Sequence, residues 1–139
     1  MDDPYNLQRF VDAQHPVYEQ VRSELREGRK RSHWMWFVFP QIEGLGNSAL
    51  ARRFAISCLE EAEAYLKHPL LGLRLRECTG LVNLVESAAI DRIFGYPDDL
   101  KFRSSMTLFA KATPDNRVFN EALSKYFGGE PDQPTLERL

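Results

Sequence analysis

The sequence predicts an all-α fold, a single globular domain spanning residues 1–139 and built from about six or seven helices. Apolar residues recur at i, i+3 and i+4 along most of the chain, which is the period of an amphipathic helix rather than of a strand. Proline, glycine and short polar residues interrupt this pattern at intervals typical of helix ends. An apolar fraction of 43% and a charged fraction of 27% in 139 residues suit one domain with its own core.

Two helices are expected in the N-terminal part of the chain. The first would begin after Asn6 as its N-cap, and the second at His15-Pro16, because proline suits the first position of a helix. Gly28 would end the second helix, since glycine readily adopts the left-handed conformation of a helix C-terminus. The apolar stripes of these helices are Leu7, Phe10 and Val11, and Val17, Val21 and Leu25.

Three further helices are expected in the middle of the chain. The segment Ser57-Cys58-Leu59-Glu60 has the S-x-x-E form of a capping box, and His68-Pro69 would end the helix that it begins. The next helix would run from about Pro69 to Val85, and a short one from Ser87 to the residue before Gly95. The expected buried faces are Leu59, Ala62, Tyr65 and Leu66, then Leu71, Leu75, Cys78, Val82 and Val85, and finally Ile90, Ile93 and Phe94.

The C-terminal third predicts two helices and a last helical turn. Pro97-Asp98-Asp99 is a turn-and-cap signal, and the segment Thr113 to Asn116 breaks the chain before the second of these helices. That helix would stop at Gly128-Gly129, and a last turn would follow Pro134. The apolar residues of these elements are Phe102, Met106 and Phe109, then Val118, Phe119, Ala122, Leu123 and Tyr126, and finally Leu136 and Leu139.

One stretch departs from this pattern, the run RKRSHWMWFVFPQIEGLG from Arg29 to Gly46. The residues from Trp34 to Phe39 are all apolar, so periodicity does not separate a buried helix from a buried strand there. Their simplest interpretation is the centre of a small core, because each aromatic side chain can bury about 150–250 Å². The alternatives are the wall of a ligand pocket and an exposed surface that binds a partner protein.

The residues around this run favour a pocket. Gln41 offers a directional amide, and the glycines of Gly44-Leu45-Gly46 allow close backbone approach before Asn47-Ser48, where another helix would begin. The cations of Arg29-Lys30-Arg31 could hold a phosphate or complement the dipole of a helix C-terminus. The competing class is a protein-interaction module that uses the basic and aromatic surface from Arg29 to Phe39, since tryptophan and arginine are enriched in interface hot spots.

A second polar cluster lies in the segment PDDLKFRSSMTLF. Asp98 and Asp99 suit the start of a helix, where carboxylates interact favourably with the helix dipole. Lys101 follows, and then the adjacent Ser104 and Ser105, which are unfavourable inside a helix because their hydroxyl groups compete with the backbone. Such a local inconsistency is typical of a functional site. We therefore expect this cluster and the aromatic run to converge on one pocket.

The composition disfavours several classes of function. A formal charge of −2 and a pI near 5.9 disfavour nucleic acid as a partner, and no apolar run approaches the roughly 20 residues that cross a membrane. Cys58 and Cys78 lack C-x-x-C spacing and are expected to be reduced thiols in a cytoplasmic protein. The histidines lack the spacing of metal ligands, so no metal and no cofactor is expected. Nothing in the sequence indicates an oligomeric state.

No established set of catalytic residues is recognisable in the sequence, and whether the protein is an enzyme stays open at this stage. There is no G-x-S-x-G motif and no cysteine with a histidine in a known family context. If the ligand is cleaved, Asp98 or Asp99 would be the candidate base and His33 the candidate acid.

Four segments of the chain closely resemble one uncharacterised bacterial family. They are RKRSHWMWFVFPQIEGLG, EEAEAYLKHPLLGLRLRECT, PDDLKFRSSMTLF and the ending KYFGGEPDQPTL. On these segments the chain is identified as a member of the domain-of-unknown-function family 1810, which often carries the automatic label calpastatin. The resemblance covers nearly the whole chain and implies a mainly α-helical single domain. The label carries little weight, because calpastatins are disordered inhibitors and this composition is that of a packed globule.

At the level of fold, this family is similar to the helical NADAR proteins, which act on ADP-ribose-type substrates. The likeness is one of fold, since the NADAR motifs are not matched here residue by residue. It favours a phosphorylated, nucleotide-like ligand, with an aromatic slot for the base and with cations and helix N-termini for the phosphates. The residues expected to bind this ligand are Arg31, His33, Trp34, Trp36, Gln41, Gly44, Gly46, Lys101, Ser104 and Ser105.

Overall fold

The computed structural model describes residues 2–86 and 88–139, and every regular element in this part of the chain is a helix. In chain order the helices are α1 (Gln8–Gln14), α2 (Tyr18–Glu27), α3 (Met35–Val38), α4 (Ala49–Arg53), α5 (Leu59–Lys67), α6 (Leu71–Leu84), α7 (Ile90–Phe94), α8 (Asp98–Lys111), α9 (Arg117–Phe127) and α10 (Gln133–Leu136). The all-α prediction is confirmed. The expected number of six or seven helices is wrong, because the described residues form ten.

The additional helices are short ones that a periodic pattern cannot define. α3, α4 and α10 contain four, five and four residues, so each makes little more than one turn. One turn shows no repeated apolar spacing, which is why the sequence predicted only an ambiguous apolar segment, a helix start and a last turn there. The ambiguous segment is a helix, and the strand-like pairing nearby is an isolated bridge between Ile42 and Ile56.

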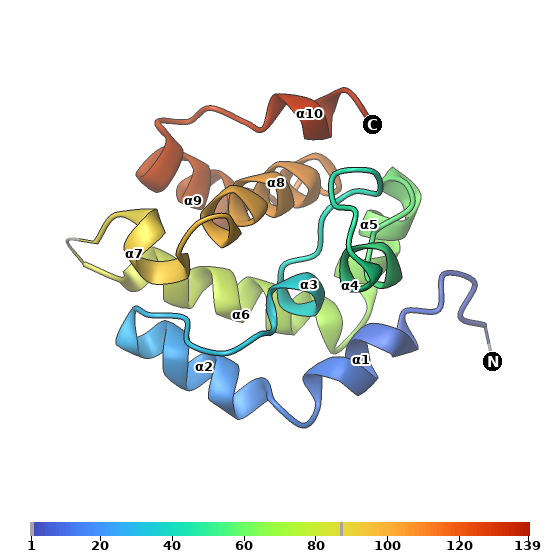
Figure 1. Ribbon diagram of the computed structural model, residues 1–139. Coiled ribbons are helices and arrows are strands. Elements are labelled where there is room, and N and C mark those ends of the chain that lie inside the picture. The colour runs from blue at the N-terminus through green and yellow to red at the C-terminus, as the bar shows by residue number, and fades with distance from the viewer. Residues whose placement is uncertain (1, 87) are drawn as a thin grey trace.

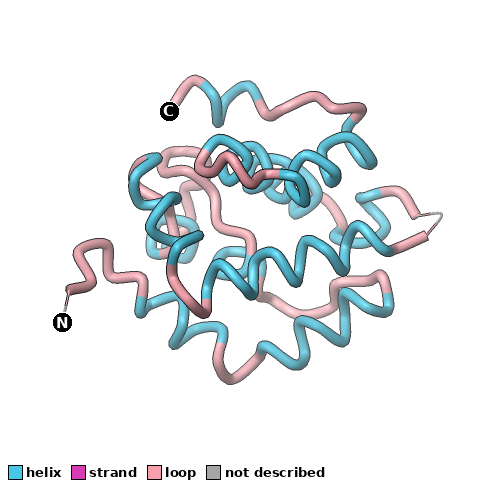
Figure 2. Tube along the Cα trace, turned by 180° about the vertical axis from the view of Figure 1, so that it is seen from behind, coloured by secondary structure: helices cyan, strands magenta, loops and turns pink. Residues whose placement is uncertain are grey.

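Two long helices, α6 and α8, organise the molecule (Figure 1). α6 lies between α2 on one side and α9 on the other, and α8 packs against α5, α7, α9 and α10. Figure 2, seen from behind, shows the same layers, with the long α6 helix across the middle. None of the helices in the described residues is long and apolar enough to cross a membrane.

One hydrophobic core joins these helices, and the aromatic run supplies part of it. Trp34 and Phe39 are each 1% exposed. The Phe39 ring centroid lies 5.0 Å from that of Phe102 in α8 and 5.7 Å from that of Phe94 in α7. Both contacts are edge-on, a geometry that is favourable for aromatic rings. Trp36 is only half-buried, so this ring lies at the edge of the core.

Several helix ends lie where the sequence placed them. Gly28 and Gly128 end α2 and α9 in the left-handed conformation, with φ of 76° and 63°. Ser48 caps α4, because its hydroxyl accepts a hydrogen bond from the N–H of Ala51. The helix start expected at Ser87 lies outside the described residues.

Two expected caps are wrong. Asn6 does not cap α1, because it adopts a left-handed conformation with φ of 51° and the carboxylate of Asp3 accepts the N–H groups at the start of the helix instead. In the expected capping box, the acceptor for Ser57 is Glu61 rather than Glu60, at 2.9 Å from the Ser57 nitrogen and 2.7 Å from its hydroxyl. Both differences arise because a neighbouring carboxylate competes for the same donors.

Candidate functional site

The two segments that the sequence singled out meet at the N-terminal end of α8. Lys101 Nζ lies 5.4 Å from the ring centroid of Trp36 in α3 and 3.5 Å from Asp98 Oδ1. Asp98 Oδ2 lies 3.0 Å from Lys30 Nζ, so this carboxylate faces two ammonium groups. The aromatic run and the polar cluster of α8 are therefore in contact.

A small closed pocket lies where α3, α4 and α8 approach one another. Its volume is about 20 Å³, which is room for a single water molecule. Its apolar wall includes Trp36, Phe39 and Phe54, and its polar wall includes Gln41, Arg52 and Lys101. A larger molecule can enter this pocket only if part of the wall moves.

An open groove adjoins the closed pocket. Its volume is about 350 Å³, which is within the range of small-molecule sites. Gln41, Gly46 and Lys101 line both the groove and the closed pocket. The remaining wall of the groove combines apolar residues with two polar ones, namely Leu45, Pro97, Leu100 and Pro134, and Ser104 and Asp132.

A buried glutamate, which the sequence did not single out, fixes the segment that leads into α3. Glu24 of α2 is 0% exposed, and its Oε1 accepts hydrogen bonds from the N–H of Arg31 at 2.7 Å and from the N–H of Ser32 and the indole N–H of Trp34, both at 3.0 Å. Its Oε2 accepts from the Ser32 hydroxyl and from Gln20. Burial raises the pKa of Glu24, but these hydrogen bonds outweigh it and bring the pKa to about 2. Trp34 is thereby anchored in the core.

Two glycines shape the loop over the closed pocket. Gly44 has a φ of 97°, a conformation that L side chains rarely adopt. A Cβ atom at Gly46 would lie 2.6 Å from the Cβ of Ala51, so glycine is what lets the loop pack this closely on α4. The N–H groups of Gly44 and Gly46 donate to no acceptor within residues 2–86 and 88–139. They are therefore available to an anion.

The adjacent serines of α8 have different surroundings. Ser104 lines the open groove and donates a hydrogen bond to Asp132 Oδ2 at 2.9 Å. Ser105 is 0% exposed, and its hydroxyl has no hydrogen-bond partner among the described residues. The wall of the groove and that of the closed pocket do not include Ser105.

Alanine at these two positions is expected to change stability in opposite directions. Ser104→Ala removes a buried hydrogen bond to a carboxylate and should lower the free energy of unfolding by about 1–2 kcal/mol. Ser105→Ala removes a buried hydroxyl without a partner and introduces a better helix former, so it should raise that free energy by up to about 1 kcal/mol. Urea denaturation of both variants measures the difference, and a destabilised Ser105→Ala variant would contradict this account of Ser105.

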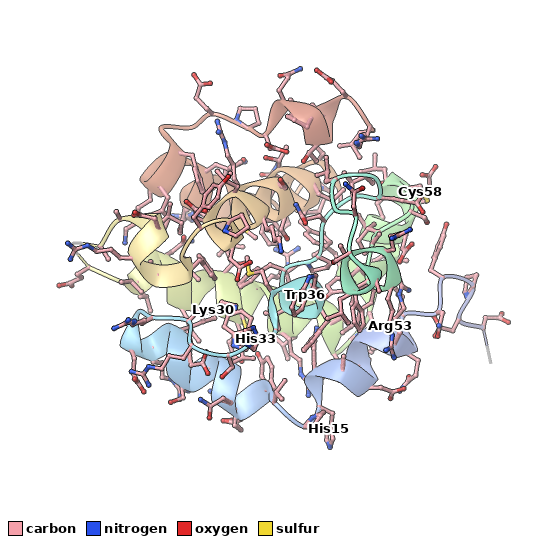
Figure 3. The ribbon with its side chains drawn as sticks, in the orientation of Figure 1. His15, Lys30, His33, Trp36, Arg53 and Cys58 are labelled. Carbon is pink, nitrogen blue, oxygen red and sulfur yellow. The ribbon has the colours of Figure 1, made fainter. Side chains whose placement is uncertain are left out.

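Six of the sequence-predicted residues do not line the open groove or the closed pocket. Asp98 pairs with Lys30 and Lys101, and Asp99 is half-buried in the first turn of α8. Trp34 is in the core, Arg31 is exposed and paired with Glu27, and Ser105 is buried inside α8. His33 is exposed on the segment between α2 and α3, where Figure 3 labels it.

Three charged residues of the site were missed in the sequence, and one of them, Glu43, lines the closed pocket from the loop before α4. Arg52 of α4 lines the closed pocket, and its Nη2 donates to the carbonyl of Asn47 at 2.6 Å. Asp132 lines the open groove from the segment before α10. Arg52 and Asp132 belong to no local sequence motif. Tertiary packing, rather than the residues next to them in sequence, brings them to the site.

The fold and the site together define a small all-α domain with a closed aromatic pocket beside an open polar groove. The chain belongs to the family described as "Protein of unknown function (DUF1810)", whose model matches residues 4–139. The family expected from the sequence is thus confirmed.

A crystal structure with this fold is that of the conserved hypothetical protein Rv1873 from Mycobacterium tuberculosis. The two chains are 63% identical with a TM-score of 0.98, and the alignment covers 99% of this chain and 98% of that one. No curated protein matches the chain. Neither the family description nor the name of that hypothetical protein states an activity, so a function has to be argued from the site.

Proposed function

We propose that the open groove and the closed pocket bind a phosphorylated, base-containing small molecule of the ADP-ribose class. The observation that carries this proposal is the wall common to both, in which Gln41, Gly46 and Lys101 bring an amide, a flexible backbone and a cation together. A groove of about 350 Å³ with apolar walls and a few polar groups is typical of a small-molecule site. The resemblance to the helical NADAR proteins that the sequence suggested favours this ligand class by analogy.

The groups suited to phosphate lie on two sides of the closed pocket. Lys101 approaches from α8 and Arg52 from α4, and both line the pocket. The N–H groups of Gly44 and Gly46 lie in the loop that precedes α4 and donate to no acceptor in the described part of the chain. Phosphate oxygens are favourable acceptors for such a set of cations and backbone N–H groups.

Trp36 supplies a ring for the base, but one of its faces is occupied by Lys101, whose Nζ lies 5.4 Å from the ring centroid. A base can stack on that face only if the ammonium group leaves it. A phosphate offers this ammonium a stronger partner than the ring does. Ligand binding should therefore move Lys101 from Trp36 to the phosphate, and stacking of the base should then contribute about 1–3 kcal/mol.

The burial of the aromatic run favours this proposal over a protein-interaction module. Such a module needs large side chains exposed at the centre of the interface. Trp34, Met35 and Phe39 are each 1% exposed, and Trp36 and Phe37 are half-buried. The exposed residues between Arg29 and Phe39 are Arg29, Arg31 and His33.

A thermal-shift screen with AMP, ADP and ADP-ribose tests the proposal. At least one of these nucleotides at millimolar concentration should raise the melting temperature, since a ligand at about 100 times its Kd stabilises by about 2.7 kcal/mol. Lys101→Ala and Trp36→Ala should each reduce this shift, because they remove the phosphate partner and the stacking ring.

Lys111→Ala is the matched control, because Lys111 is an exposed cation at the opposite end of the same helix. Its ligand-induced shift should equal that of the wild type. A protein that responds to no nucleotide contradicts the proposal and leaves the interaction module as the better explanation. A shift that survives both Lys101→Ala and Trp36→Ala would mean that the ligand binds elsewhere.

A further inference from the structure

The open groove contains one carboxylate, Asp132, on the same wall as Lys101 and Ser104. Lys101 and Ser104 are three residues apart in α8, so they occupy neighbouring positions on one face of that helix. The Ser104 hydroxyl donates to Asp132 Oδ2 at 2.9 Å. The carboxylate therefore lies beside Ser104, on the same groove that Lys101 lines.

Asp132 is held in one orientation through a single carboxylate oxygen. Oδ2 accepts hydrogen bonds from the Ser104 hydroxyl at 2.9 Å and from the N–H and hydroxyl of Thr135 at 3.2 and 2.6 Å. The backbone is fixed as well, since the N–H of Asp132 donates to Thr107 Oγ1 at 2.9 Å. The cap of α10 is thus formed by Oδ2 alone.

The other oxygen, Oδ1, has no role in these contacts. It accepts no hydrogen bond from residues 2–86 and 88–139, and it is not sealed from solvent. Asp132 lines the groove, and a carboxylate that is fixed by one oxygen while the other stays unbonded is a preorganised acceptor. Such an oxygen repels a phosphate but binds hydroxyl groups, which donate hydrogen bonds to its lone pairs.

We propose that Asp132 Oδ1 binds the vicinal hydroxyl groups of a ribose, so that the groove selects ribonucleotides over nucleotides that lack these hydroxyls. This inference rests on the proposed function and specifies which part of the ligand lies where. The 5′-phosphate lies at Lys101 and the ribose lies over Asp132. The two groups are adjacent in a nucleotide, and Lys101 and Asp132 both line the groove.

Titration calorimetry with AMP and with 2′,3′-dideoxy-AMP tests the inference. The wild type should bind AMP about tenfold or more tightly than the dideoxy analogue, because hydrogen bonds to a charged acceptor are strong. Asp132→Ser keeps a good cap for α10 but has no second oxygen, so its preference for AMP should disappear. Asp132→Asn keeps the shape and the cap, and should reduce the preference by a smaller factor. Glu130→Ser, which changes an exposed carboxylate two residues away, should keep the wild-type preference.

The outcomes separate this inference from the proposed function. Equal binding of the two nucleotides by the wild type would overturn the role of Asp132 and leave the proposed function standing. So would a preference for AMP that survives both Asp132→Ser and Asp132→Asn. Absence of binding by both nucleotides to the wild type would overturn the proposed function, and this inference with it.

Discussion

Glu24→Ala is expected to lower the free energy of unfolding by about 4 kcal/mol, because it leaves several buried donors without an acceptor. The carboxylate of Glu24 is the acceptor for the N–H of Arg31 and for the N–H and hydroxyl of Ser32, as well as for the indole N–H of Trp34. Glu24→Gln keeps the shape and one acceptor oxygen, so about 2 kcal/mol is expected. Guanidinium chloride denaturation measures both values.

Glu19→Ala is the control for this pair of variants. Glu19 lies on the same helix, but its carboxylate is exposed and pairs with Arg22 at the surface. Such a pair contributes little, so the variant should lie within about 0.5 kcal/mol of the wild type. A Glu24→Ala variant as stable as Glu19→Ala would show that Glu24 does not hold the segment before α3.

The pKa of Glu24 also predicts where acid destabilises the protein. Hydrogen bonds lower this pKa from 4.5 to about 2, so the carboxylate stabilises the folded state fully above pH 4.5. That stabilisation is lost as the pH falls from about 4.5 towards 2, because the unfolded chain then binds the proton more readily. Glu24→Gln should remove this part of the acid dependence.

Gly72→Ala is expected to destabilise the protein by about 3 kcal/mol, whereas Gly80→Ala in the same helix should stabilise it by about 0.5–1 kcal/mol. A Cβ atom at Gly72 would lie 2.0 Å from the carbonyl oxygen of Leu66, so α6 would have to move away from the end of α5. A Cβ atom at Gly80 would meet nothing within 4 Å, so only the gain in helix propensity remains.

The melting temperatures of these two variants should differ by roughly 10 °C. Differential scanning calorimetry measures both melting temperatures. Both variants change a glycine of α6 to alanine, so their difference reports the contact between α6 and the end of α5. If Gly72→Ala melts at or above the temperature of the wild type, the close approach of α5 and α6 is not required by the fold.

The sequence predicted well those parts of the fold that depend on local spacing. The stripes of α2 and α9 repeat over several turns, and Gly28 and Gly128 end these helices with the conformation that glycine favours. α3 was predicted only as an ambiguous apolar segment and α10 only as a last turn, because one turn contains no repeat. The Asn6 cap failed because Asp3 reaches the same donors from outside the helix.

The site was predictable only in part. Trp36 and Lys101 stood out as an aromatic and a cation beside local irregularities, and they do lie together. Glu24 could not be recognised, because a glutamate on an amphipathic helix is ordinarily solvated and its burial depends on how the segment after the helix folds back over it. Arg52 and Asp132 were missed for the same reason, since tertiary packing brings them to the groove and the pocket.

The most direct test of the proposed ligand site is a titration of the ¹⁵N-labelled protein with ADP-ribose, followed by amide and indole chemical shifts. The largest changes should occur at Gln41, Gly44, Gly46 and Lys101, together with the indole N–H of Trp36. The chemical shifts of residues at the surface groove on α9, which Asn120 and Lys125 line, should not change. A spectrum unchanged at millimolar ADP-ribose, or one in which only the α9 groove responds, would contradict a ligand site between α3, α4 and α8.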